Sequence, residues 1–328
     1  MLTGIQETIY KTSNSGKQKK DRYEMHKYWG KKPSNDLSAL ISKYSKEGDT
    51  LLDPFSGYGV FCCEAYIQKR NVVSNDLNPI ANFIQHQLFR KDIDFIKLQN
   101  AFNVIVKKLS PYIADWYRVG PPDAKQTAVT VLRNSNNDII KCKYYNGTAT
   151  NLKEYVFSSQ EINQFRDFEK NYSVDTWYPE NELIENSRIS AKKGMKIPDL
   201  FTIRTLACNS KLFQLIMENS DGPERDLLLL AFTSNIANCS KLVPPIKSRG
   251  DMATGAWMTG FYWGETYLEN NVLHYFKNRY KKIVNGKLEY LSSFETLFHA
   301  DDFTDIQKVS SISQFNDKTY GYHHCCPR

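Results

Sequence analysis

Residues 50–59 read TLLDPFSGYG, and this stretch decides the fold. Its first residues are mostly apolar and end in the acid Asp53, a pattern typical of a short buried strand. Two glycines follow at Gly57 and Gly59, and residues 60–69 then have the apolar content of a helix. A strand, a glycine-rich turn and a helix in this order predict the opening of an α/β sheet.

A second strand and a second helix follow the first pair. Residues 71–75 predict the strand, and the acid Asp76 comes directly after it. Asn78 is a good N-cap and Pro79 suits the first helical turn, so a helix is expected to run to about Phe89. The whole unit is typical of a doubly wound α/β sheet with parallel strands.

The acids at the ends of the two expected strands indicate what the turn binds. Phosphate-binding turns carry the pattern GxGxxG directly after the strand. Here Asp53 and Pro54 precede the glycines, and no third glycine follows. A carboxylate repels a pyrophosphate but attracts an ammonium group, so S-adenosylmethionine, which carries an ammonium and a sulfonium, fits better than NAD. Asp76 is placed to accept hydrogen bonds from ribose hydroxyls.

Several motifs together resemble one enzyme family. DPFSGYG at 53–59 resembles the DPFxGxG motif of amino-group DNA methyltransferases, and HKYWGKKP at 26–33 resembles their upstream motif. NDLNP at 75–79 resembles the acid that follows the second strand in this family, and looser resemblances cover residues 226–284 and 301–305. The resemblance implies a Rossmann-like methyltransferase sheet and methyl transfer from S-adenosylmethionine to adenine N6 or cytosine N4.

The resemblance also implies which residues bind the cofactor. The upstream motif would close over the methionine half, and Asp302 would meet the adenine amine. The expected cofactor-binding residues are Trp29, Lys31, Pro33, Asp53, Pro54, Phe55, Ser56, Gly57, Gly59, Asp76 and Asp302. Plainer interpretations stay open: Lys31 as a solvated charge, Asp76 as a helix cap, and the turn as part of another α/β protein.

The sequence lacks the motif that carries catalysis in this family. Such enzymes need (D/N/S)PP(Y/F/W), whose acid or amide and backbone carbonyl accept the amine protons while the aromatic ring stacks on the flipped base. The Pro-Pro pairs at 121–122 and 244–245 do not have these flanking residues. The catalytic residues are therefore unknown, and the sequence indicates a truncated form, a frameshifted form or one subunit of a split enzyme. We expect this chain by itself to bind cofactor weakly and to transfer no methyl group.

The middle of the chain has a different pattern. Residues 127–145 predict a β-hairpin, and SSQE at 158–161 is a capping box that opens a helix. We interpret residues 95–225 as a large mixed α+β insertion and a candidate target-recognition region. The DNA-binding candidates are Arg188, Lys192, Lys193, Lys196 and Arg249. These cations would contact phosphates, although such charges also suit an exposed loop.

The predicted organisation has four parts. A flexible basic arm occupies residues 1–24, and the cofactor-binding half of the methyltransferase domain occupies 25–94. The insertion of 95–225 follows, and residues 226–328 return to the methyltransferase domain, truncated before the catalytic motif. Within this last part we expect a buried helix, a loop and a second helix, at residues 226–241, 242–264 and 265–283.

Composition narrows the remaining choices. The chain has 328 residues, a net charge of +7 and 13% aromatic residues, which is typical of a globular protein and suits a nucleic-acid partner. It has no apolar run long enough for a membrane span and no signal pattern at its start. Its seven cysteines form no CxxC pair, so we expect reduced thiols, a cytoplasmic protein and no metal site.

The resulting hypothesis is a site-specific DNA methyltransferase that acts on a flipped base within a restriction–modification system. Adenine N6 is favoured over cytosine N4 as the target. DNA is the expected partner, together with a second chain if the catalytic half is separate. Two alternatives stay open: a non-catalytic DNA-binding or cofactor-binding subunit of a split methyltransferase, and an RNA methyltransferase.

Overall fold

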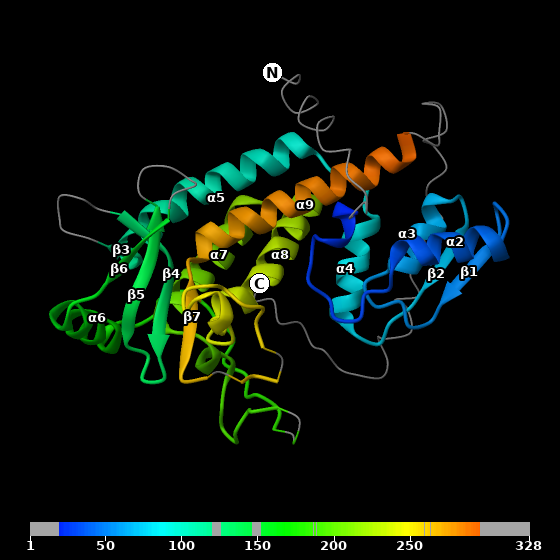
Figure 1. Cartoon of the computed structure of the whole chain (residues 1–328). Helices are drawn as coiled ribbons and strands as arrows, with labels where there is room; N and C mark the ends of the chain where they lie inside the picture. Colours follow the sequence, from blue (N-terminus) through cyan, green and yellow to red (C-terminus); the bar gives the residue numbers. More distant parts are fainter. Residues whose placement is uncertain are drawn as a thin grey trace.

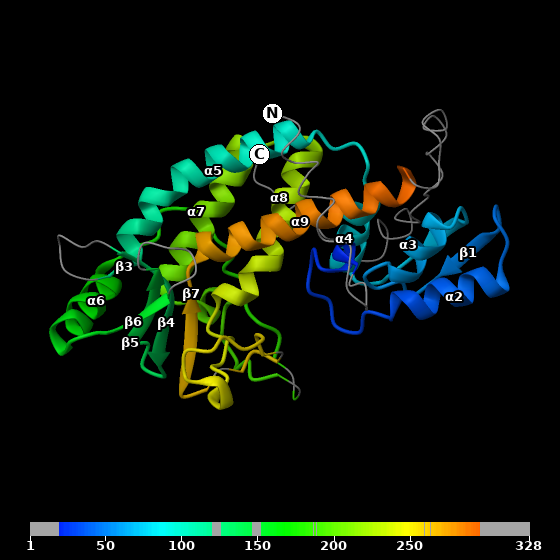
Figure 2. The same cartoon turned by 45° about the horizontal axis from the view of Figure 1, so that its top comes forward.

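Three groups of elements make up the computed structural model (Figure 1). A small α/β unit lies at one end, a five-stranded sheet lies at the other, and long helices run between them (Figures 1 and 2). The structure describes residues 20–119, 126–145, 152–185, 187, 189–258, 260–262 and 264–295.

The α/β unit contains two parallel strands, β1 (Thr50–Asp53) and β2 (Asn71–Ser74), with Thr50 opposite Asn71. Its helices are α2 (Ser34–Tyr44), α3 (Val60–Ile67) and α4 (Pro79–Phe89). The Asn78 side chain caps α4, as predicted, by accepting a hydrogen bond from the Ile80 N–H group. The structure thus confirms a mixed α/β fold. Among the described residues only β1 and β2 pair in parallel, so the wider doubly wound sheet stays a prediction.

The second sheet is antiparallel. Its strands are β3 (Arg118–Val119), β4 (Gln126–Asn134), β5 (Ile139–Tyr145), β6 (Leu152–Val156) and β7 (Thr266–Asn270). β4 and β5 form the predicted hairpin, and both β3 and β7 pair with β4. Helix α6 (Ser159–Asn171) follows β6 and opens with the predicted capping box of Ser158 and Glu161.

Four long helices join the two sheets. They are α5 (Phe95–Trp116), α7 (Ile203–Asn219), α8 (Gly222–Ile236) and α9 (Val272–Glu295). The buried residues of α5 recur every three or four positions, and the ring of Phe102 stacks 3.7 Å from that of Tyr280 on α9. Four short 3₁₀ helices complete the described elements: η1 (Asp21–Tyr23), η2 (Ile197–Leu200), η3 (Ala237–Cys239) and η4 (Lys247–Arg249).

One hydrophobic core runs through all three groups. It contains Tyr58 of the glycine turn (residues 53–59), Ile105 of α5, Val131 of β4 and Phe276 of α9. β7, which belongs to the returning segment, pairs with β4 of the expected insertion, so residues 95–225 share their core with residues 226–295. In the part of the chain that the structure describes, every helix is too short or too polar to cross a lipid bilayer.

The predicted helix over 265–283 is wrong at its start. Residues 266–270 form β7, with Asn270 opposite Thr130 and Thr266 opposite Asn134. Asn271 follows the strand and still donates its N–H to the Val129 carbonyl. Its side chain accepts from the N–H of His274 in the first turn of α9. The pairing with a strand some 135 positions earlier overrides the local helical pattern.

The expected flexible arm of residues 1–24 is folded where the structure describes it. Arg22 is only 3% exposed, and its guanidinium donates to Glu64 of α3 at 3.1 Å and to Glu289 of α9 at 2.5 Å. The basic character of Lys20 and Arg22 therefore serves these internal ion pairs, because Lys20 also contacts Glu64 at 2.7 Å.

Candidate functional site

Asp53 lies at the carboxyl end of β1 and is the acid that the sequence singled out. It is buried, and its Oδ1 accepts a hydrogen bond from the Phe55 N–H group at 3.2 Å. Its Oδ2 is buried without a hydrogen-bond partner, and the nearest cation is the Lys32 ammonium at 3.7 Å. A buried carboxylate oxygen with no donor is costly, so this oxygen is suited to receive a donor from a ligand.

Asp76 joins the ends of the two parallel strands. Its Oδ2 accepts from the Gly57 N–H group at 2.7 Å, and its Oδ1 accepts from the Asn78 N–H group at 2.9 Å. Each carboxylate oxygen can accept two hydrogen bonds, so both retain one acceptor position. The structure therefore brings Asp53, the glycine turn and Asp76 together at one edge of the sheet.

The two glycines of the turn are required by geometry. Gly57 and Gly59 have φ angles of 54° and 89°, the left-handed region in which side chains are strained. A Cβ at Gly57 would lie 3.1 Å from the Tyr28 ring, and one at Gly59 would lie 2.8 Å from Gln85 Cγ. The backbone of the turn is thus packed closely from two sides.

Gln85 of α4 is a site residue that the sequence reasoning missed. Its Nε2 donates to Ser56 Oγ at 2.9 Å and to the Gly57 carbonyl at 2.8 Å. These two hydrogen bonds hold the turn against α4. A signal was present, because Gln85 is a polar residue on the face of α4 that buries Ala81, Ile84 and Leu88. Buried polar side chains are normally hydrogen-bonded, so such a residue indicates a specific partner.

The upstream segment, residues 26–33, packs against this turn. Lys31 donates to the carbonyls of Tyr23 and His26, and its ammonium lies 4.4 Å from the centre of the Tyr58 ring. Burial, and then the charge of Asp76, raise the pKa of the Tyr28 phenol. Lys31, an expected cofactor ligand, is thus used to shape the segment.

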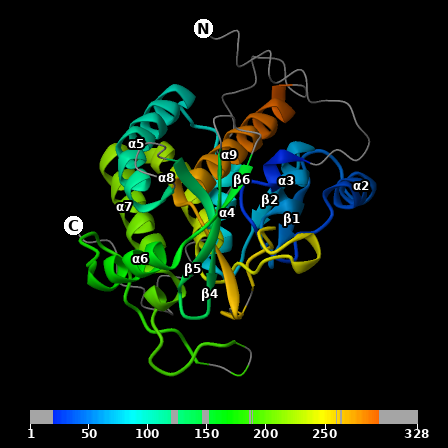
Figure 3. The same ribbon diagram turned by 60° about the vertical axis from the view of Figure 1, so that its left-hand side comes forward.

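Trp29 connects the upstream segment to the loop that follows η3. Its ring packs edge to face against that of Trp257, with 5.9 Å between the ring centres. The Lys27 ammonium lies 4.1 Å from the centre of the Trp29 ring. Burial lowers the pKa of Lys27, and the charge of Arg279 lowers it further. Figure 3 shows this loop, coloured yellow, reaching toward the β1–β2 unit.

Apolar side chains are exposed around the two acids. Phe55, which follows Pro54 in the turn, is 83% exposed, and Leu77 and Ile80, just after Asp76, are exposed as well. Pro33, another expected ligand, is exposed and precedes the first turn of α2. Exposed apolar side chains that gather beside a polar site are typical of ligand-binding surfaces.

Comparison with known proteins gives two matches. A family model described as DNA methylase matches residues 5–84, which include the upstream segment, the turn and Asp76. The predicted resemblance to amino-group DNA methyltransferases is confirmed. A tRNA (guanine(37)-N(1))-methyltransferase of Drosophila pseudoobscura pseudoobscura is 30% identical over 108 residues, which is 32% of this chain and 24% of the relative.

Both matches point to a methyltransferase, and they differ in the nucleic acid that their names give. The chain spans about a quarter of the length of the curated relative that it matches. No solved structure matches the chain.

The described DNA-binding candidates lie on two loops. Lys192, Lys193 and Lys196 are exposed on the loop before η2, and Arg249 is exposed in η4. The Lys196 ammonium lies 3.8 Å from Glu180. Arg188 and Asp302 lie outside the described residues, as do the last cysteines and histidines. Within the described ranges, no cluster of His, Cys, Asp and Glu is arranged to hold a metal ion.

Proposed function

We propose that this chain is the cofactor-binding part of an S-adenosylmethionine-dependent DNA methyltransferase. The observation that carries the proposal is the Oδ2 of Asp53, which is buried without a hydrogen-bond donor at the end of β1, with the Lys32 ammonium at 3.7 Å, beside a glycine turn that Asp76 closes. The match of residues 5–84 to DNA methylases supports it, because this range contains Asp53, the glycine turn and Asp76.

The described residues fit the chemistry of this cofactor. Asp53 Oδ2 would accept from the cofactor ammonium, beside the turn whose left-handed backbone Gly57 and Gly59 permit. Asp76 would use its remaining acceptor positions for ribose hydroxyls, and the exposed Phe55 and Leu77 would cover apolar surface of the ligand. The bound cofactor would supply the methyl group.

We further propose that a second chain completes the enzyme and supplies the catalytic half. Among the described residues only β2 pairs with β1, and Leu52 in the middle of β1 is 62% exposed. Strands at the centre of a parallel sheet are normally buried on both faces. Among the described residues the second edge of β1 is therefore open to a further strand, and the face at Leu52 is open to a covering element. Adenine N6 as the target, a cytoplasmic location and a role in a restriction–modification system remain parts of this proposal.

Calorimetric titration with S-adenosylmethionine tests the cofactor site. We expect measurable binding by the chain. The affinity of Asp53→Ala should be at least about tenfold lower, since a charge-assisted hydrogen bond contributes about 1.5–3 kcal/mol. Asp36→Ala, an exposed acid at the start of α2, is the matched control and should bind like the original chain. Equal binding by the Asp53→Ala variant would refute the role of Asp53.

An RNA substrate is a second candidate. It is favoured by the relative from Drosophila pseudoobscura pseudoobscura, whose name gives a tRNA as its substrate. Competition between duplex DNA and a folded RNA for the same chain separates the two candidates. The DNA proposal expects the duplex to displace the RNA, and the reverse order would favour RNA.

A further inference from the structure

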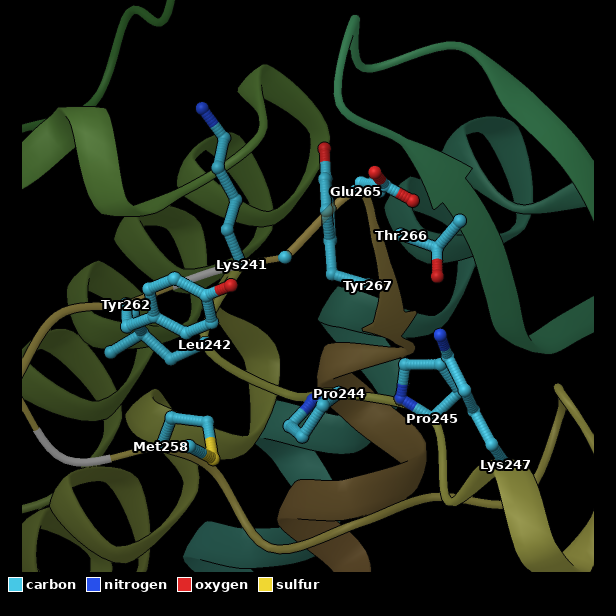
Figure 4. Close-up of a pocket in the computed structure, with 11 residues that line it drawn as sticks. Lys241, Leu242, Pro244, Pro245, Lys247, Met258, Tyr262, Glu265, Thr266 and Tyr267 are labelled. Carbon is cyan, nitrogen blue, oxygen red and sulfur yellow. The ribbon is translucent and has the colours of Figure 1, made fainter.

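A pocket of about 440 Å³, which no residue of the glycine turn lines, lies between the start of β7 and the loop after η3 (Figure 4). Leu242 and Tyr267 form its buried floor, and Met258 and Tyr262 form one wall. Pockets for small organic groups normally have volumes of about 300–1,000 Å³. This pocket therefore has room for a group of nucleotide size.

The side chains of the pocket combine flat apolar surface with positive charge. Tyr262 is 54% exposed, so its ring is available for stacking. Tyr267 is held in place because its hydroxyl donates to Asn137 Oδ1 at 2.6 Å. Lys241 and Lys247 reach the pocket from different sides in Figure 4, and Glu265 is the acid among the lining residues.

A nucleotide matches this combination. Single-stranded nucleic acids are bound by aromatic rings on which bases stack and by cations that follow the phosphates. Two lysines and one glutamate leave the lining with an excess of positive charge, as a phosphate requires.

The basic loop before η2 is attached to the edge of the same pocket. The Ser190 N–H group donates to the Gly260 carbonyl at 2.6 Å, and the Lys241 N–H group donates to the Leu200 carbonyl at 2.9 Å. Between these two anchors the loop carries the exposed cations Lys192, Lys193 and Lys196. The phosphates on either side of a nucleotide in the pocket would thus meet further positive charge.

The pocket is also connected to the cofactor side of the molecule. Met258 in its wall directly follows Trp257, whose ring contacts Trp29 of the upstream segment at 5.9 Å. A strand that occupies the pocket would therefore lie beside the segment that packs on the cofactor turn.

We propose that this pocket is a nucleotide-binding subsite, in which one base of the nucleic-acid substrate stacks on Tyr262 while Lys241, Lys247 and the basic loop bind the neighbouring phosphates. The proposal rests on the proposed action on nucleic acid and adds a site separate from the cofactor turn. Its base would be an unpaired one, because a paired base inside a duplex cannot enter a pocket.

The test uses the full chain and a single-stranded DNA of about 16 nucleotides that contains one 2-aminopurine. Fluorescence anisotropy gives the affinity, and quenching of 2-aminopurine reports stacking. We expect Tyr262→Ala to weaken binding about tenfold and to abolish the quenching, whereas Tyr262→Phe keeps both. Tyr44→Ala, an exposed tyrosine of α2, is the control and should change neither.

Lys247→Gln provides a second readout that does not depend on the aromatic ring. Removal of one phosphate contact should reduce the slope of log affinity against log salt by about one. If the original chain binds the DNA but Tyr262→Ala binds and quenches equally well, the subsite proposal is overturned and the proposed function stands. If the original chain binds neither DNA nor the matching RNA, the subsite proposal is overturned, and the titration with S-adenosylmethionine decides the cofactor-binding role by itself. Tighter binding of the RNA with the same dependence on Tyr262 supports the subsite and overturns the DNA substrate.

Discussion

Gly59 and Gly48 have nearly the same backbone conformation in different surroundings. Their φ angles are 89° and 86°, but a Cβ at Gly59 would meet Gln85 at 2.8 Å, whereas one at Gly48 would meet nothing within 4 Å. Gly48→Ala should cost about 1–2 kcal/mol of unfolding free energy from the backbone conformation. Gly59→Ala should cost more and should also weaken cofactor binding. Urea unfolding and calorimetric titration check both, and equal losses in the two variants would contradict the close packing of the turn.

Glu64 is the acid on which the N-terminal segment is held. Burial disfavours its charged form, but hydrogen bonds from Lys20 and Tyr23 and the charge of Arg22 outweigh this, so the pKa of Glu64 lies below its usual value of 4.5. The Glu64 carboxylate binds a proton more readily in the unfolded chain than in the folded one. Its contribution to stability is therefore present above pH 4.5 and is lost as the pH falls through the lowered pKa.

Glu64→Gln should therefore lower the unfolding free energy at pH 7 by about 3 kcal/mol, because it leaves a buried guanidinium with less compensating charge. The difference between the variant and the original chain should shrink below pH 4.5. Urea unfolding at a series of pH values measures it. The control is Glu47→Gln, in an exposed pair with Lys69, which should cost less than about 1 kcal/mol. A loss in Glu64→Gln that does not change with pH would argue against the ion pair of Glu64 and Arg22.

At the scale of elements, Lys287 of α9 holds the carboxyl end of α4. Its side chain is fully buried, and its ammonium donates to the carbonyls of Gln87 at 2.9 Å, Leu88 at 3.0 Å and Arg90. The last carbonyls of a helix have no partner within the helix, so this side chain satisfies them. α4 carries Gln85, and through it the end of α9 supports the glycine turn.

Lys287→Met should destabilise the protein by about 3 kcal/mol, because it keeps the apolar stem and leaves buried carbonyls without donors. Hydrogen exchange should show the largest loss of protection in α4. Lys281→Met, an exposed position on the same helix, should be within about 0.5 kcal/mol of the original chain. Unchanged protection of α4 in Lys287→Met would show that the cap is dispensable.

At the scale of the whole molecule, one buried ion network joins the insertion to the returning segment. Glu269 of β7 contacts Arg133 of β4 at 2.5 Å and Arg204 of α7 at 3.1 Å, and Glu169 of α6 contacts Arg133 at 2.5 Å. Burial raises the pKa of Glu269, but the two guanidiniums outweigh it and hold the pKa below its usual value. The network ties four elements that lie far apart in the sequence.

Glu269→Gln should lower the unfolding free energy by about 3–5 kcal/mol, since two buried guanidiniums then share one carboxylate. Glu154→Gln, which affects a partly exposed pair with Lys141, should cost less than about 1 kcal/mol. Thermal unfolding followed by circular dichroism compares them. A small loss in Glu269→Gln would mean that the sheet does not depend on the network.

The sequence by itself determined the local elements and the acids of the candidate site. The bounds of β1, α4 and α6 follow from apolar runs, caps and glycines that lie within a few residues of each boundary. The position of Asp53 and Asp76 at neighbouring strand ends follows from the same signals, because parallel strands carry their carboxyl ends to one edge.

Only the tertiary structure decided the features that need a distant partner. Residues 266–270 are a strand because β4 offers an edge, and Arg22 is buried because Glu289, 267 positions away, neutralises it. The contact of Gln85 with the turn and the contact of Trp29 with Trp257 also join residues that are distant in the sequence. A local sequence window contains the propensity of a residue but not the surface that buries it, and burial against that surface outweighs propensities of less than about 1 kcal/mol per residue.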